Sequence, residues 1–173
     1  MSGLVKNGAV IADVWSRPAD DAALPTDAPV VVSKARFLAE AGDLRGRNAP
    51  LGLSLRAGDT LDGLEDDLNR FALIALDFPA YTDGRAYSLA RLLRERHGYT
   101  GDLRAEGDVL WDQIPLMKRC GFDEFAIRDD RVLNALVAGR IQDVPVHYQP
   151  AGREDVEIQP PGARPWLRLE PGA

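Results

Sequence analysis

The 173-residue chain is poor in the residues that usually hold metals and redox cofactors. Cys120 is its single cysteine, so this chain alone cannot form a disulfide framework, a CxxC redox pair or an iron–sulfur cluster. His97 and His147 are its two histidines, which leaves little for a histidine-rich site, and we expect no bound metal. The low cysteine count therefore excludes CxxC-type redox enzymes and proteins that hold an iron–sulfur cluster with their own cysteines.

Long apolar runs and a basic leader are also missing. No stretch approaches the roughly 20 apolar residues of a membrane-spanning helix, and the N-terminus lacks the pattern of a secretory signal. A lone thiol suits the reduced cytoplasm, where we expect the protein. The formal net charge of -6 provides no excess of cations to neutralise phosphates, so we expect no nucleic-acid partner, and without a long apolar run we expect no membrane partner.

The remaining composition, 45% hydrophobic, is enough to bury the core of one domain. We expect a single α/β domain over residues 1–150, followed by a Pro- and Gly-rich tail over 150–173. The domain begins with a β-hairpin over 1–15, in which Asn7-Gly8 takes the positive φ angles of a type I′ turn. Repeated βα units are expected from about residue 30 to 148.

Strand and helix patterns alternate within these repeats. Strands are expected at 30–32, 51–55, 73–78, 103–105, 124–128 and 144–148. Helices are expected at 34–41 (capped by Ser33, ended by Gly42), from 59 or 60 to 71, at 84–97, from 108 or 112 to 120, and at 133–141.

Such an alternation predicts a parallel sheet with right-handed crossovers. We favour a partial, TIM-barrel-like sheet, because no Gly-rich nucleotide-binding loop follows the first strand; an open doubly wound sheet is the alternative. The edges of a partial barrel would need a partner subunit or the hairpin to cover them.

Ligands of such sheets bind at the carboxyl ends of the strands. The segment from Tyr81 to Arg85 follows the third strand and opens a helix, where free N–H groups and an arginine suit an anion. The alternative is local: Thr82 or Asp83 caps the helix, and Arg85 pairs with Asp83 or Asp77. Similarly, Asp77, Glu106 and Asp108 could form a carboxylate cluster for Mg²⁺ or acid–base work, or simply cap helices and pair with arginines.

Two groups of residues have plain structural readings. Cys120 lies on the apolar stripe of its helix, which predicts a buried and unreactive thiol. In the helix at 84–97, the apolar stripe leaves Arg91, Arg94, Glu95 and Arg96 on the solvent face.

Three sequence words, taken together, resemble a known family. They are F-x-x-x-T-D-G-R-x-Y-S-x-A-R-L-L-R, then G-D-V-x-x-D-Q, then R-C-G-F-D, all between Phe78 and Asp123. This region is similar to the bacterial domain-of-unknown-function 934 family, with a looser similarity over most of residues 30–150. Glu106 stands where the family usually has an apolar residue, which weakens the carboxylate-cluster interpretation.

The resemblance implies an oxidoreductase associated with sulfite reduction in sulfate assimilation, with no mechanism attached. It makes the 82–88 segment the best candidate site. The anion or substrate would be bound by Thr82, Gly84, Arg85, Tyr87 and Ser88, with Arg104 and Arg128. Asp83 and Asp108 would be the catalytic, proton-transferring groups. The cofactor stays open, because no motif for siroheme, flavin or an iron–sulfur cluster is present.

Two functions follow as hypotheses. In the first, the protein binds a sulfur oxyanion or its carrier at the strand ends and acts in assimilatory sulfate and sulfite reduction. In the second, it is a non-catalytic accessory protein that docks on sulfite reductase or its electron donor. A homodimer of two partial barrels is a third, purely structural option.

Overall fold

The computed structural model describes residues 3–140. Its centre is a seven-stranded mixed sheet with the order β2-β1-β7-β6-β5-β4-β3. The strands are β1 (Gly3–Lys6), β2 (Ala9–Ile11), β3 (Val30–Ser33), β4 (Leu51–Leu55), β5 (Leu73–Phe78), β6 (Asp102–Gly107) and β7 (Glu124–Ile127). β3 to β7 are parallel and neighbour one another in chain order, as the βα repeats predict. The sheet is open, because β2 and β3 form two separate edges.

The N-terminal hairpin extends this sheet. Asn7 and Gly8 have φ angles of 52° and 77°, so the expected turn joins β1 to β2. β1 then pairs antiparallel with β7, which is how the hairpin covers one edge of the parallel strands. The predicted hairpin is confirmed, but β2 ends at Ile11 and the chain from Ala12 leaves the sheet.

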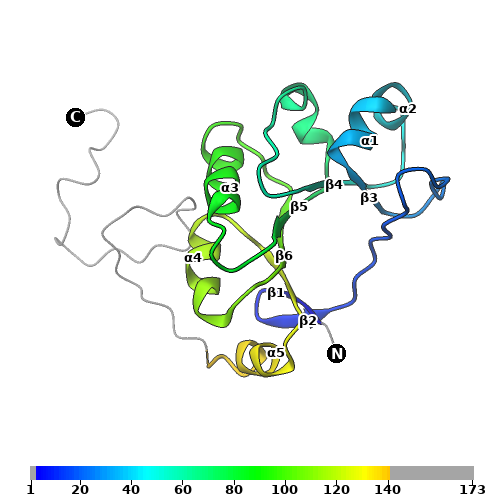
Figure 1. Ribbon diagram of the computed structural model, residues 1–173. Helices are drawn as coiled ribbons and strands as arrows, with labels where there is room; N and C mark the ends of the chain where they lie inside the picture. Colours follow the sequence, from blue (N-terminus) through cyan, green and yellow to red (C-terminus); the bar gives the residue numbers. More distant parts are fainter. Residues whose placement is uncertain (1–2, 141–173) are drawn as a thin grey trace, which may run out of the picture.

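A helix or a pair of short helices follows each parallel strand. These helices are α1 (Lys34–Ala39), α2 (Ala41–Arg45), the 3₁₀ helix η1 (Glu65–Arg70), α3 (Arg85–Glu95), the 3₁₀ helix η2 (Trp111–Gln113), α4 (Ile114–Arg119) and α5 (Asp130–Val137). In Figure 1, α1, α3 and α4 lie outside the curve of the sheet. Alternate strand residues such as Ile74, Leu76 and Phe78 face these helices and form the core, since side chains of a strand alternate between its faces.

The other face of the sheet carries charged residues on β6 and β7, among them Arg104 and Glu124, beside small and apolar residues on β3 to β5; we call it the polar face. It is crossed by a short segment, residues 13–17, which we call the strap. Figure 1 shows the chain after β2 running along the open side of the curve toward β3. The backbone of Ser16 pairs there with Pro29 and Val31. The Trp15 ring lies over Gly52 of β4, where an added Cβ would come within 3.2 Å of the ring.

Several local expectations need correction. Ser33 caps α1 as expected, because its side chain accepts a hydrogen bond from the Arg36 backbone N–H at 3.0 Å. Gly42 does not end the helix: α1 ends at Ala39, and Gly42 lies inside the second short helix, α2. The helix expected to begin at Asp59 or Thr60 is a turn followed by the 3₁₀ helix η1, because Gly63 has a positive φ of 79°, which a continuous right-handed helix cannot contain. The expected strand at 144–148 and the tail at 150–173 lie outside the described residues.

Arg94 was placed on the solvent face of its helix, and this is wrong. Its side chain is 9% exposed, and its guanidinium donates to the carbonyl oxygens of Tyr99, Gly101 and Gly121 and to Asp123. The reason is tertiary: the end of α3 packs against the loops that enter β6 and β7, and their carbonyls converge on the guanidinium. Arg91, by contrast, forms an exposed pair with Glu95 at 2.7 Å. No helix in the described part of the chain combines the length and apolar character needed to cross a membrane.

Candidate functional site

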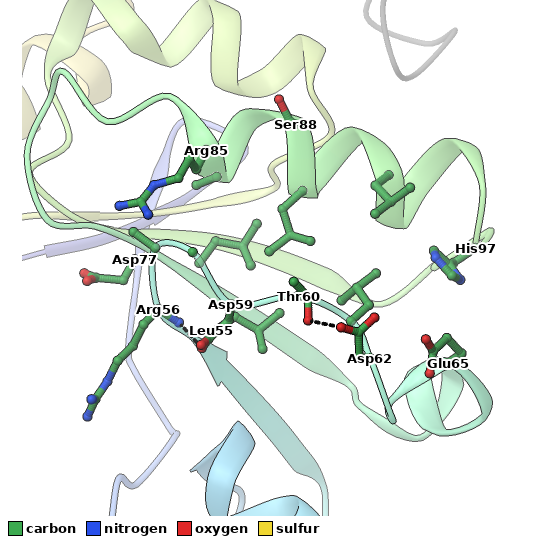
Figure 2. A pocket seen from close by; sticks show the side chains of 17 residues that line it. Leu55, Arg56, Asp59, Thr60, Asp62, Glu65, Asp77, Arg85, Ser88 and His97 are labelled. Atoms are coloured by element: carbon green, nitrogen blue, oxygen red, sulfur yellow. Dashed lines mark hydrogen bonds between the residues drawn. The ribbon is translucent and has the colours of Figure 1, made fainter.

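A pocket of about 460 Å³ opens at the carboxyl ends of β4 and β5, beside α3. Its apolar wall consists of Leu55, Leu61, Leu76, Ala86, Leu89 and Leu92. Its polar lining consists of Arg56, Asp59, Thr60, Asp62, Glu65, Asp77, Arg85, Ser88 and His97, with Ala57 and Gly58 completing the loop. Figure 2 shows Arg56, Asp77 and Arg85 toward one end of this pocket and Glu65 and His97 toward the other.

A second pocket, of about 430 Å³, adjoins the first along the same rim. It lies at the ends of β3 and β4 and is lined by Asp20, Ser33, Lys34, Ala35, Leu38, Ser54, Arg56 and Asp59. Two neighbouring pockets thus lie at the carboxyl ends of the parallel strands, and Arg56 and Asp59 line both of them.

The turn after β4 positions Arg56 between the two pockets. Asp59 Oδ2 accepts a 2.7 Å hydrogen bond from the Arg56 backbone N–H, and Gly58 supplies the positive φ of 97° that closes the turn. The Arg56 side chain is exposed and forms no ion pair with any described residue. The Lys34 ammonium donates a hydrogen bond to the Thr60 carbonyl at 2.7 Å and has no carboxylate partner among the described residues. Both cations are thus available to an anion.

The 82–88 segment has a different geometry from the one expected of an open anion site. Arg85 forms a bidentate ion pair with Asp83: its Nε donates to Oδ1 at 2.9 Å and its Nη2 donates to Oδ2 at 2.6 Å. The Asp83 carboxylate also accepts a hydrogen bond from the Arg85 backbone N–H. These bonds lower the pKa of Asp83 to about 2. The Asp83 carboxylate therefore occupies the start of α3. Arg85 nevertheless lies over the turn after β4, since a Cβ at Gly58 would come within 2.7 Å of its Nη1.

The other residues of this segment separate. Thr82 and Gly84 are exposed, and Ser88 lines the first pocket with its hydroxyl pointing away from the carboxylates across it (Figure 2). Tyr87 lies on another side of α3, where its ring packs edge-on against Phe78 at a centroid distance of 5.2 Å. Burial, together with the nearby Cys120 and Asp112, raises the pKa of Tyr87 to about 12. Tyr87 is therefore a packing residue in this arrangement.

Asp108 holds a loop. Its Oδ2 accepts a 2.9 Å hydrogen bond from the Tyr81 backbone N–H, while Gln113 donates to the Tyr81 carbonyl at 2.8 Å. Asp108 and Gln113, which both belong to the second of the family motifs, therefore hold the loop that precedes Asp83 through its backbone. Glu106 joins other partners on the polar face of the sheet, so Asp77, Glu106 and Asp108 do not converge on one ion. No group of three potential metal ligands occurs among residues 3–140.

Arg104 lies at the centre of the polar face, away from the rim pockets. It is 1% exposed and donates to Glu124 at 2.9 Å and to Asp13 of the strap at 2.9 Å. Arg17 of the strap pairs with Glu106. Burial raises the pKa of Glu106, and the two neighbouring arginines oppose that shift. Arg104 thus anchors the strap. Arg128 is exposed after β7 and, like Arg104, lines neither rim pocket.

Cys120 is buried at the end of α4, as predicted. Burial raises the pKa of its thiol, so the unreactive protonated form is favoured at neutral pH.

The residues that sequence reasoning left out of the site include Lys34, Arg56, Asp59 and Thr60. Their signal was available in part, since Lys34 and Arg56 each come directly after the end of an apolar strand. The sequence did not show that the carboxyl ends of β3 and β4 lie close to the start of α3, where Arg85 stands.

Comparison with known proteins identifies the family. The model of the family described as "Bacterial protein of unknown function (DUF934)" matches residues 52–158, more than half of the chain. The chain therefore belongs to this family, as the resemblance of the sequence words indicated. No curated protein matches it.

Proposed function

We propose that this member of the DUF934 family binds a sulfur oxyanion, or a small molecule carrying one, at the rim of its sheet, and that it serves sulfite reduction in the cytoplasm. The observation that carries the proposal is the placement of Arg56. It lies between two adjoining pockets and forms no ion pair with the described residues. The sulfur assignment rests on what the family resemblance implies.

The chemistry of the rim suits a tetrahedral anion. Arg56 offers a planar fork of donors and Lys34 a compact point charge, the two complementary ways of holding such a group. Arg85 adds positive charge from the neighbouring loop, although Asp83 already takes its best hydrogen bonds. We therefore assign the main anion contacts to Lys34 and Arg56, and a supporting role to Arg85.

The proposal is one of binding. Asp83 is ionised at neutral pH because its pKa is about 2, so it has no proton to donate there. The Asp108 carboxylate is engaged by the Tyr81 peptide group. Neither residue is assigned a proton transfer.

A thermal-shift series tests the proposal with sulfite, sulfate and adenylyl sulfate as ligands. A ligand at 100 times its Kd stabilises a protein by about 2.7 kcal/mol, which raises Tm by several degrees in a chain of this size. We expect that rise with at least one of the three ligands in the wild type and in Arg96→Ala, whose exposed arginine lines neither pocket. Arg56→Ala and Lys34→Ala should abolish it. An equal rise in all four proteins would contradict the assignment.

We also propose that the curved sheet is an incomplete β/α barrel rather than a doubly wound sheet. The sequential order of β3 to β7 and the position of α1, α3 and α4 outside the curve support this reading. In a complete barrel further strands would stand where the strap now crosses.

A second function, docking on sulfite reductase or its electron donor, is favoured by one surface feature. Tyr81 and Trp111 are 55% and 54% exposed; Tyr81 lies on the loop before α3 and Trp111 begins η2, and the hydrogen bonds of Asp108 and Gln113 hold these two segments together. Exposed aromatic residues are enriched in protein interfaces. Binding of immobilised sulfite reductase should weaken at least about tenfold in the Tyr81→Ala/Trp111→Ala variant and persist in Leu38→Ala, an exposed apolar residue elsewhere. Arg56→Ala should leave docking intact, which separates the two functions.

A further inference from the structure

The first rim pocket carries charges without ion pairs at both of its ends. Arg56 stands at one end, where the Asp77 carboxylate also lies, and Asp62 and Glu65 stand at the other; none of these four forms an ion pair with a described residue. The local bonds of these carboxylates are single ones: Thr60 Oγ1 donates to Asp62 at 2.7 Å, and the Gly63 N–H donates to Glu65 at 2.9 Å. Each carboxylate retains an oxygen that can accept from a ligand.

The middle of the pocket is apolar. Leu55 and Leu76 are 1% exposed and form its floor, while Leu89 and Leu92 of α3 form a wall. A volume of about 460 Å³ lies within the range of sites for small organic ligands, which is roughly 300–1,000 Å³, and far exceeds what a bare tetrahedral anion fills.

Electrostatics also argues against a bare anion here. Four carboxylates, those of Asp59, Asp62, Glu65 and Asp77, line the same pocket as the two arginines. An ion that bound near them without offering hydrogen-bond donors would meet their repulsion and gain nothing from the apolar wall. A ligand that presents donors to Asp62 and Glu65 converts that repulsion into binding energy.

We infer that the ligand of this pocket is a nucleotide with an amino-substituted purine base. The base lies against the leucines and directs its exocyclic amine to Asp62 and Glu65, and the phosphate or phosphosulfate group reaches Arg56. This inference rests on the proposed function, since Arg56 binds the anion in both, and it identifies the carrier of the oxyanion as a purine nucleotide.

The test is calorimetric titration of the full chain with AMP, GMP, IMP, adenylyl sulfate and sodium sulfate. We expect the amino-purine nucleotide that fits, AMP or GMP, to bind at least about tenfold more tightly than both IMP and sulfate, because an exocyclic amine bonded to a carboxylate is worth about that factor. Asp62→Asn/Glu65→Gln should remove the preference over IMP. Asp66→Asn, which changes a neighbouring carboxylate that lines neither rim pocket, should keep it.

A steric variant provides an independent check. Leu89→Trp fills the apolar middle and should abolish nucleotide binding while leaving sulfate binding and the Tm of the free protein close to those of the wild type. Sulfate that binds through Arg56 as tightly as every nucleotide would overturn the inference and keep the proposed function. Nucleotide binding that Arg56→Ala does not weaken would overturn the anion site and keep the base site, and no binding of any probe would overturn both.

Discussion

At the scale of single residues, the arginines of this protein differ more than their spacing in the sequence suggests. Arg104 is buried and pairs with Glu124, and Arg94 donates hydrogen bonds to backbone carbonyls. Arg85 forms an ion pair with Asp83, whereas Arg56 has no ion-pair partner among the described residues. Because a planar guanidinium offers five donors, the same residue type can be an anchor or a ligand-binding group. The neighbours that decide between these roles come from distant parts of the chain.

The Asp83–Arg85 pair yields a pH prediction. Because the pKa of Asp83 is lowered from its ordinary 3.8 to about 2, the pair stabilises the fold above about pH 4, and that contribution is lost as the pH falls through 2. Arg85→Ala should raise the pKa of Asp83 toward 3.8, as read from an NMR titration of its carboxyl carbon. The difference in unfolding free energy between the two proteins should vanish at low pH. An unchanged pKa would show that Arg85 is not its cause.

Arg104 yields a stability prediction. Arg104→Ala leaves the buried Glu124 carboxylate without its main partner and should lower the free energy of unfolding by about 3–5 kcal/mol in urea denaturation. Arg104→Met combined with Glu124→Gln removes both charges and should recover most of that loss. The exposed Arg91→Ala should cost less than about 1 kcal/mol. Equal effects of Arg104→Ala and Arg91→Ala would refute a structural role for Arg104.

At the scale of elements, the loop between β5 and α3 is held from the outside. Asp108 and Gln113 bind the two sides of the Tyr81 peptide group, although they come from the segment after β6. Gly107 allows this approach, since its φ is 93° and a Cβ there would clash with the Phe78 carbonyl. Two of the words that carry the family resemblance are thus joined by contacts between loops.

Hydrogen exchange measures this clamp. In Asp108→Ala the Tyr81 amide loses a charge-assisted bond, and it should exchange at least about tenfold faster than in the wild type. Asp112→Ala, which removes an exposed carboxylate from the same segment, should leave that rate unchanged. Identical exchange in all three proteins would mean that the loop is ordered by other contacts.

At the scale of the whole molecule, the strap joins the two edges of an open sheet. It leaves β2, pairs with the start of β3 and sends Asp13, Trp15 and Arg17 across the polar face. Charged residues on that face are costly unless they are paired, and the strap supplies two of the partners. A segment without regular secondary structure therefore supplies the ion-pair partners that charged residues on the polar face of this open sheet require.

Trp15 tests this role. Trp15→Ala should lower the unfolding free energy by about 2 kcal/mol, less than the about 3–5 kcal/mol typical of a fully buried ring, because Trp15 is half-buried. Val14→Ala changes the adjacent side chain, which is 65% exposed, and should stay within about 0.5 kcal/mol of the wild type. Urea denaturation of the two variants gives the comparison, and equal values would show that the strap does not stabilise the sheet.

Local features of the sequence were sufficient for the β3 to β7 strands and for several turns and caps, but not for every helix. The alternation of apolar strands with amphipathic helices, the Asn7-Gly8 turn, the Ser33 cap and the burial of Cys120 all depend on periodicity or on residues a few positions apart. The family, too, could be identified from the words between Phe78 and Asp123.

The site depended on tertiary structure. Lys34, Arg56 and Arg85 come from three separate crossovers and are brought to one rim by the parallel order of β3, β4 and β5. Tyr87 and Ser88 are adjacent in sequence yet lie on different sides of α3, and Arg94 is buried by loops that sequence spacing does not place. Strand pairing and helix packing act over tens of residues, so only the folded chain decides which charges meet and which remain without a partner.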